Sequence, residues 1–169
     1  MKTAYLVTGI VGSGKSCVYD ELTRCGYNAY ELDDLEDIVI KLPEPNTKSI
    51  KSSRHAIRSQ YNWAYDLQKI LELLDKQKES IAFYCGVAGN INDAVGFFAK
   101  TILLSASNEV IRHRLDGRIS ENNISDESHE WTLAWKDSWE EYLISAGAIS
   151  ISSDNNIDIV VNQIIDSVK

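Results

Sequence analysis

Short apolar runs alternate along the chain with longer segments in which apolar residues recur every three or four positions. The short runs are rich in β-branched and aromatic residues, which predicts buried strands, and the longer period predicts amphipathic helices. The expected strands cover residues 3–8, 27–32, 80–85, 101–105 and 148–152. The expected helices cover residues 17–24, 35–42, 60–79, 91–98, 108–117, 127–146 and 156–168. This alternation predicts an α/β fold, in which helices cover both faces of a parallel sheet.

Between the first expected strand and the first expected helix lies the segment Gly9–Ser16, which matches the phosphate-binding pattern G-x-x-x-x-G-K-[ST]. Glycines let a backbone turn tightly and bring its N–H groups against phosphate oxygens. The helix that begins near Lys15 would aim its amides and positive dipole end at the same anion. Lys15 would reach the β- and γ-phosphates, and the Ser16 hydroxyl would bind Mg²⁺. The residues predicted to bind nucleotide here are Gly9, Gly12, Ser13, Gly14, Lys15, Ser16 and Cys17.

Two other interpretations of this loop stay open from the sequence. The match could arise by chance in a turn rich in glycine and serine, or the loop could fold without binding nucleotide. The strand before it and the helix after it favour the functional interpretation, because strand, glycine loop and helix form the arrangement that phosphate binding requires.

The composition limits the partners that we expect. A chain of 169 residues is expected to form one domain, residues 1–169. Its formal net charge is −8, which argues against general binding to nucleic acids or membrane surfaces, since both are polyanionic. No run approaches the ~18 apolar residues that a membrane span requires. The three cysteines show no C-x-x-C spacing, so we expect reduced thiols in a cytoplasmic protein.

Three further features accompany the loop. Asp33 and Asp34 end the second expected strand, Cys85-Gly86 ends the third, and Arg114 and Arg118 flank the expected end of a helix at Gly117. With the loop, these features make the chain resemble, over nearly its whole length, the small P-loop kinases: nucleoside-monophosphate, shikimate and gluconate kinases and dephospho-CoA kinase. The resemblance implies a three-layer fold with a five-stranded parallel sheet in the order 2-3-1-4-5.

The resemblance also implies roles for these residues. Asp33 or Asp34 would contact the acceptor or a Mg²⁺-bound water, and the glycine turn at Gly86 would line the acceptor pocket. Arg114 and Arg118 would close over the phosphates, with a lid at about residues 118–126. The implied catalytic residues are Lys15, Asp33 and Arg118.

A narrower resemblance is to a group of small bacterial ATP-binding proteins related to these kinases. It rests on Gly-Tyr-x-Ala-Tyr at residues 26–30, Cys-Gly-x-Ala-x-Asn at 85–90 and Ser-Ala-Gly-Ala-Ile at 145–149. This group names no substrate. One departure from the wider pattern is that no acidic residue ends the third strand, so Mg²⁺ would rest on Ser16, the phosphates and water, with Asp33 as a further candidate.

Several of these residues have a structural alternative. Asp33 and Asp34 could cap the expected helix 35–42, and Arg118 could be a solvated arginine. Arg54 and Arg58, four positions apart, could bind an anionic acceptor or form a solvated basic helix face. The stripe Trp131, Trp135 and Trp139 could stack on a ring, although core packing is the commoner role of such a stripe.

The sequence therefore predicts a kinase that transfers the γ-phosphoryl group of ATP, with Mg²⁺, to an unidentified small-molecule acceptor. The chemistry would be in-line transfer assisted by positioning and charge stabilisation. The alternatives are a non-catalytic or weakly hydrolytic nucleotide-binding module, which the missing acid favours, and a nucleoside-monophosphate kinase. Acceptor-stimulated release of ADP separates the kinases from the binding module.

Overall fold

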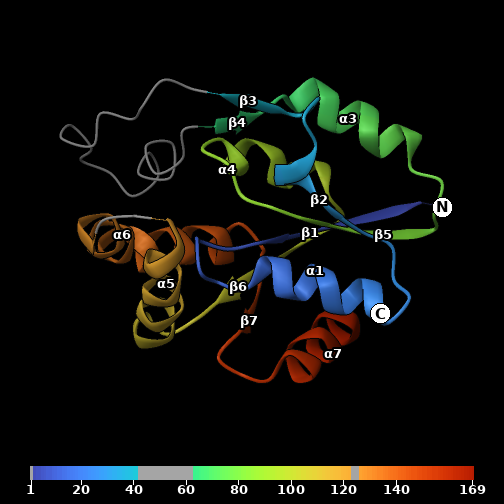
Figure 1. Ribbon diagram of the computed structural model, residues 1–169. Coiled ribbons are helices and arrows are strands. Elements are labelled where there is room, and N and C mark those ends of the chain that lie inside the picture. Colours follow the sequence, from blue (N-terminus) through green and yellow to red (C-terminus); the bar gives the residue numbers. More distant parts are fainter. Residues whose placement is uncertain (1, 42–62, 123–125) are drawn as a thin grey trace.

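A parallel sheet of five strands lies at the centre of the molecule, described here from a computed structural model that covers residues 2–41, 63–122 and 126–169. Its spatial order is β2-β5-β1-β6-β7 (Figure 1). The strands are β1 (Thr3–Thr8), β2 (Ala29–Glu31), β5 (Ile81–Cys85), β6 (Lys100–Ser105) and β7 (Ile149–Ser152). Counted among themselves, these five strands follow the expected order 2-3-1-4-5.

The strand numbers differ from those expected, because the chain contains two further strands after β2. These strands, β3 (Val39–Lys41) and β4 (Trp63–Tyr65), pair with each other in an antiparallel two-stranded sheet. They do not join the central sheet.

Helices cover both faces of the sheet, as the sequence pattern predicts. The helices are α1 (Lys15–Arg24), α3 (Leu67–Lys76), α4 (Ile91–Ala94), α5 (Asn108–Asn122), α6 (Asp126–Ser145) and α7 (Ile157–Ser167), with short 3₁₀ turns η1 (Leu32–Asp34) and η3 (Val95–Phe97). On one face α1 and α7 lie together, and α3 and α4 lie on the other (Figure 1).

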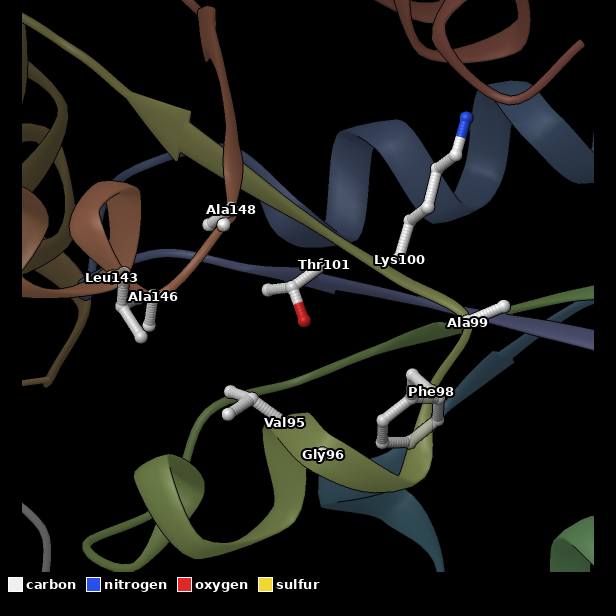
Figure 2. Close-up of a pocket in the computed structure, with 10 residues that line it drawn as sticks. Val95, Gly96, Phe98, Ala99, Lys100, Thr101, Leu143, Ala146 and Ala148 are labelled. Atoms are coloured by element: carbon white, nitrogen blue, oxygen red, sulfur yellow. The ribbon is translucent and has the colours of Figure 1, made fainter.

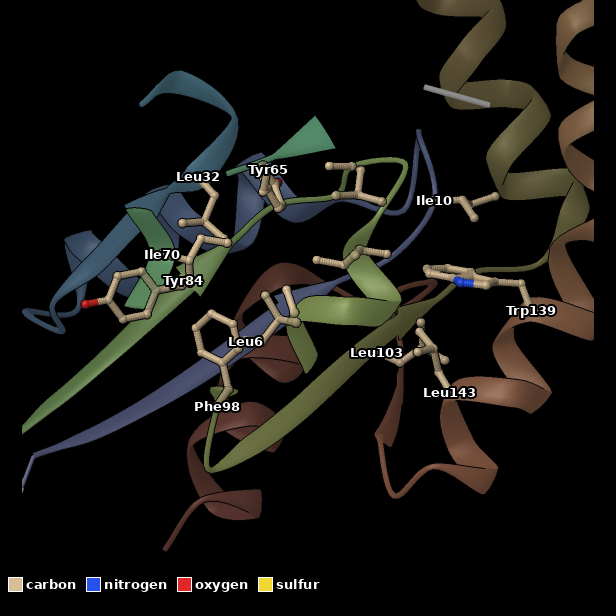
Figure 3. Packing of buried hydrophobic residues seen from close by; sticks show 14 of the residues in the cluster. Leu6, Ile10, Leu32, Tyr65, Ile70, Tyr84, Phe98, Leu103, Trp139 and Leu143 are labelled. Atoms are coloured by element: carbon tan, nitrogen blue, oxygen red, sulfur yellow. The ribbon is translucent and has the colours of Figure 1, made fainter. Parts of the chain in front are cut away.

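Alternate residues of each strand point to opposite faces and build two apolar clusters. In β1, Leu6 joins the cluster with α3, α4, α5 and α6, whereas Val7 joins the cluster with α1 and α7. Figure 3 shows the first cluster, with Leu6, Tyr84 and Trp139 among its side chains. Among the described residues, no helix is long and apolar enough to cross a bilayer.

One expected helix is wrong, and a second is shorter than expected. In place of the helix expected over 35–42, the described residues 35–41 form a turn that leads into β3. The amides of Ile38 and Val39 bond to the Leu35 carbonyl, and the chain then extends to pair with β4. The expected helix 60–79 begins only at Leu67. Asp66 caps it by accepting hydrogen bonds from the amides of Gln68 and Lys69, at 3.0 and 3.2 Å.

The expected helix end at Gly117 is also wrong, because α5 continues through this glycine to Asn122. An exposed glycine inside a helix costs only ~1 kcal/mol relative to alanine, so it does not have to end one. The expected lid therefore contains helical residues at its start, and residues 123–125 lie outside the described chain. The lid itself stays a prediction.

The tryptophan stripe packs in the core. Trp139 is completely buried and Trp135 nearly so, and the Trp139 Nε1 donates to Asn92 Oδ1 at 3.0 Å. This arrangement excludes ring stacking on a ligand for these two residues. The Trp131 side chain lies outside the described part of the chain.

Candidate nucleotide and acceptor site

The loop after β1 has the geometry of a phosphate cradle. Gly12 and Gly14 adopt positive φ angles of 81° and 96°, a conformation that side chains disfavour. Gly9 is required for a different reason, because a Cβ there would lie 2.5 Å from Ser13 Oγ and 2.6 Å from the Leu104 carbonyl oxygen. The three glycines therefore close the loop tightly, as the sequence motif predicts.

Polar groups in and beside this loop remain without partners. The hydroxyls of Thr8 and Ser13 are buried and have no hydrogen-bond partner in the described structure. Gly14, at the N-cap of α1, has no side chain that could accept from the first amides of the helix. Buried polar groups cost free energy when they are unpaired, and helix N-termini attract anions, so the residues present fit a bound phosphate.

Lys15 begins α1 and folds back over the loop. Its Nζ donates to the carbonyl oxygens of Gly9 and Ile10, at 2.9 and 3.0 Å. The ammonium is thus held at the edge of the cradle. Ser16 and Cys17 follow in the first turn of α1, and both are exposed. A phosphate on the loop amides would lie within reach of this part of the chain.

Arg114, from α5, supports the loop from outside. Its guanidinium donates to the Gly12 carbonyl oxygen at 3.0 Å and to the Ser153 carbonyl oxygen at 2.6 Å. The structure therefore brings this predicted residue to the loop after β1, where it links the loop to the segment that follows β7. Nucleotide binding by Arg114 stays a prediction.

The end of β2 supplies a carboxyl group that the sequence interpretation missed. Glu31 pairs in register with Cys85, the last residue of β5, so it stands on the strand beside the position where no acid was found. Desolvation raises the pKa of Glu31, a hydrogen bond with Ser16 lowers it, and a hydrogen bond with Asp34 raises it. The end of the second strand was the available signal, but the sequence pattern predicts that this strand ends at residue 32, one residue after its observed end at Glu31.

Asp33 lies in η1 and is held by donors from two distant segments. The Tyr65 hydroxyl donates to Asp33 Oδ1, and the Val87 amide donates to the same oxygen at 3.3 Å. The residue nevertheless keeps exposed surface. Desolvation raises the pKa of Asp33, whereas the Tyr65 hydrogen bond, the Lys15 charge and the Val87 amide lower it. Asp33 therefore lies in the electrostatic reach of Lys15.

Gly86 is buried between the same groups. A Cβ at this position would collide with the Tyr65 hydroxyl and would lie 2.9 Å from Leu32 Cβ and 3.0 Å from Asp33 Oδ1. The glycine is thus explained by close packing around Asp33. Its predicted contact with an acceptor stays a prediction.

Several predicted residues cannot be placed at the site. Arg54 and Arg58 lie outside the described residues, and so does the side chain of Arg118, although its backbone belongs to α5. The capping interpretation of Asp33 and Asp34 is wrong, since both belong to η1 and a turn follows. Among the described residues, no group of three or more acidic, histidine or cysteine side chains could hold a metal ion.

A cavity of about 210 Å³ lies elsewhere, between η3, the start of β6 and the end of α6. Figure 2 shows Val95 and Phe98 on one side and Leu143 and Ala146 on the other, with Thr101 between them. Because the strands are parallel, this cavity lies at the amino ends of the sheet, opposite to the phosphate-binding loop. It contributes nothing to the site described above.

Comparison with known proteins connects the chain to others through its structure alone. No protein family matches the sequence, and no curated protein matches it either. Solved structures match over nearly the whole chain. A shikimate kinase from Acinetobacter baumannii in complex with shikimate has 11% identity and a TM-score of 0.63, with 99% of this chain and 93% of that chain covered.

Two further matches have the same character. A deoxyadenosine kinase from M. mycoides with bound dATP has 14% identity and a TM-score of 0.56, covering 98% of this chain and 99% of that one. A gluconokinase from Sinorhizobium meliloti has 16% identity and a TM-score of 0.52, covering 95% and 87%. The chain has the fold of the small P-loop kinases, which confirms the resemblance at the level of the fold.

Proposed function

We propose that the protein is an ATP-dependent phosphotransferase that phosphorylates a hydroxyl group of a small molecule. The observation that carries this proposal is the placement of Asp33 in the electrostatic reach of Lys15. Lys15 lies beside a loop in which, among the described residues, the buried hydroxyls of Thr8 and Ser13 have no hydrogen-bond partner. Asp33 would orient the acceptor, and Lys15 would neutralise negative charge on the phosphoryl group that is transferred.

The phosphates would occupy the loop Gly9–Ser16. Its amides and the N-terminus of α1 would donate to phosphate oxygens, and Lys15 would exchange its two carbonyl partners for the β- and γ-phosphates. Such an exchange favours binding, because a hydrogen bond between two charged groups is stronger than one to a neutral carbonyl.

The acceptor would enter beside the carboxyl ends of β2 and β5. Asp33 would accept the proton of the attacking hydroxyl, which requires an ionised carboxylate within hydrogen-bond reach. The desolvation that raises the pKa of Asp33 makes it a better proton acceptor than an ordinary surface carboxylate. The similar shikimate kinase is in complex with shikimate, a hydroxy acid, so hydroxy acids belong among the acceptors to be tested.

Mg²⁺ fits this arrangement only together with the nucleotide. Ser16 offers a hydroxyl, and this hydroxyl lowers the pKa of the Glu31 carboxyl, so both groups would meet the ion or its water ligands. When bound, Mg²⁺ supplies positive charge that offsets the charge on the β- and γ-phosphates. Glu31 thus offers, from the neighbouring strand, the acid that β5 lacks.

The test is release of ADP from ATP·Mg²⁺, with and without pooled acceptors: shikimate, gluconate, other sugars, deoxynucleosides and nucleoside monophosphates. The control is the Lys15→Ala variant. We expect a member of the pool to stimulate ADP release in the wild type and to have no effect in the variant. The proposal fails if the wild type binds nucleotide and no acceptor stimulates release.

The second candidate is a nucleotide-binding module that hydrolyses ATP slowly or not at all. It is favoured by one observation, the absence of a three-residue metal site among the described residues. Tight binding of ATP with no acceptor response would support it.

A further inference from the structure

We propose that Tyr65 is a positioning residue that fixes the Asp33 carboxylate for the acceptor. This inference rests on the proposed function. Tyr65 is 1% exposed, so its hydroxyl cannot meet a substrate directly, yet that hydroxyl donates to Asp33 Oδ1. The Val87 amide donates to the same oxygen. With Oδ1 occupied twice, Oδ2 of this exposed residue is the atom that meets the acceptor hydroxyl.

Tyr65 is itself held by a set of reciprocal contacts. Its amide donates to Asn90 Oδ1, and Asn90 Nδ2 donates back to the Tyr65 carbonyl oxygen, both at 2.8 Å. Two residues earlier, the Trp63 carbonyl accepts from the Gly89 amide, and Trp63 Nε1 donates to the Val87 carbonyl, both at 3.0 Å. Strand β4 is thereby fastened to the loop that follows β5.

Gly86 completes the arrangement, because only a residue without a Cβ leaves room for the Tyr65 hydroxyl beside Leu32 and Asp33. Three residues of the segment Cys85–Asn90 therefore help to hold Tyr65 and Asp33 in place. Gly86 makes space for the hydroxyl, Val87 provides the second donor, and Asn90 holds the backbone of Tyr65. The network joins η1, β4 and the loop after β5 around the carboxylate of Asp33.

This network predicts a particular kinetic effect. Without the hydroxyl, Asp33 would keep its place in the chain but lose its strongest donor, and its carboxylate would sample other orientations. Misorientation of a group that acts on the acceptor lowers kcat. ATP is bound by the loop after β1, so the KM for ATP is expected to stay unchanged.

The experiment compares the wild type with Tyr65→Phe and uses Tyr84→Phe as the matched control. Tyr84 is also 1% exposed and belongs to the same apolar cluster, but its hydroxyl donates to Gln77 Oε1 at 3.2 Å. The first measurement is ADP release from ATP·Mg²⁺ stimulated by the acceptor pool. The second is the ¹³C NMR signal of the Asp33 carboxyl at fixed neutral pH, identified by its loss in Asp33→Asn.

We expect Tyr65→Phe to lower kcat by about tenfold, the effect of removing one hydrogen bond to a charged group, and to leave the KM for ATP within about twofold. The Asp33 signal is expected to move in this variant. Tyr84→Phe should change neither quantity. An unmoved Asp33 signal in Tyr65→Phe overturns the inference, and so does a kcat equal to that of Tyr84→Phe.

The experiment separates a failure of the proposed kinase function from a failure of the role proposed for Tyr65. If no acceptor stimulates the wild type, the proposed activity is wrong, and the NMR comparison still decides whether Tyr65 holds Asp33. If Tyr65→Phe does not fold, Asn90→Ala replaces it, because it releases the backbone of Tyr65 and leaves the hydroxyl in place. We then expect Asn90→Ala to lower kcat, to leave the KM for ATP unchanged and to move the Asp33 NMR signal. If these effects are absent, the inference is overturned.

Discussion

The two ends of the candidate site are built in different ways. The phosphate-binding end comes from one continuous segment, Gly9–Ser16, whose shape follows from its own glycines. The acceptor end comes from three segments that meet at Asp33, with Tyr65 and Val87 lying 32 and 54 residues further along the chain. A continuous site can be recognised from its motif, whereas a dispersed one exists only once the fold is formed.

The two ends also differ in how their polar groups are satisfied. At the phosphate end the hydroxyls of Thr8 and Ser13 are buried and have no hydrogen-bond partner among the described residues. At the acceptor end Asp33, Tyr65 and Asn90 already have theirs. The phosphate end would therefore gain hydrogen bonds from a bound phosphate, whereas the polar groups of the acceptor end already bond to one another. Four substitutions test this contrast.

The largest effect is expected at the phosphate end, from Lys15→Ala. The variant loses the cation proposed to reach the transferring phosphoryl group, and we expect turnover of ATP to fall by about 100-fold or more. The fold should persist, because Lys15 belongs to neither apolar cluster and its ammonium bonds to carbonyl groups of the adjacent loop. Turnover and thermal unfolding measured on the same preparation check both parts, and unchanged turnover contradicts the role of Lys15.

At the acceptor end, Gly86→Ala should destabilise the fold. The added Cβ would collide with the Tyr65 hydroxyl and crowd Leu32 and Asp33, and overpacking of this kind costs about 1–3 kcal/mol. Gly96→Ala is the control, since a Cβ there meets nothing within 4 Å. Urea unfolding measures both variants. Equal stability of the two would show that the packing around Gly86 is looser than described.

A smaller loss of stability is expected from Asn90→Ala. Two hydrogen bonds to the backbone of Tyr65 disappear, and the exposed edge of the site lets water replace part of them, so we expect about 1 kcal/mol. The comparison is Asn28→Ala, which removes one long contact of 3.4 Å on an exposed surface. A free energy of unfolding that falls no further in Asn90→Ala than in Asn28→Ala contradicts a stabilising role for the two Asn90–Tyr65 hydrogen bonds.

The smallest effect concerns the charge of Asp33. Its pKa in the folded state lies above the ordinary value of 3.8, so the folded state favours the protonated carboxyl. The stability gained from that form is present at low pH and is lost as pH rises through the folded-state pKa. Asp33→Asn removes the decrease in stability at higher pH, because asparagine does not ionise.

At neutral pH we therefore expect Asp33→Asn to unfold with a free energy a few tenths of a kcal/mol higher than the wild type, because solvent screens an exposed carboxylate. The difference should shrink as the pH is lowered towards 4. Urea unfolding at several pH values measures it. A variant that is less stable than the wild type at neutral pH would mean that hydrogen bonds to the charge outweigh its desolvation.

Prediction from the sequence succeeded for features that local residues determine and failed for features that depend on distant segments. The central strands and the loop Gly9–Ser16 could be predicted, because local apolar patterns and glycines determine them. The strands β3 and β4 and the start of α3 could not, because residues at helical spacing, such as Trp63 and Leu67, also fit a strand followed by a capped helix. The choice is made by pairing between β3 and β4, which are separated by more than 20 positions.

The acceptor end shows the same limitation in its individual residues. The place of Asp33 just after the second strand could be predicted, and its role at the site stays a prediction. Tyr65 gave no signal, because its importance depends on the approach of its hydroxyl to Asp33 past Gly86. Glu31 was missed as a candidate because its position beside Cys85 in the sheet is not revealed by the chain order alone.

The central claim is transfer of the γ-phosphoryl group to an acceptor bound at Asp33. The most direct measurement is ³¹P NMR of the products formed from ATP·Mg²⁺ and the acceptor pool, with wild type and Asp33→Asn compared. We predict a new phosphate ester signal with the wild type and a strongly reduced one with the variant. Inorganic phosphate as the sole product beside ADP, in equal amounts from both proteins, would contradict the account.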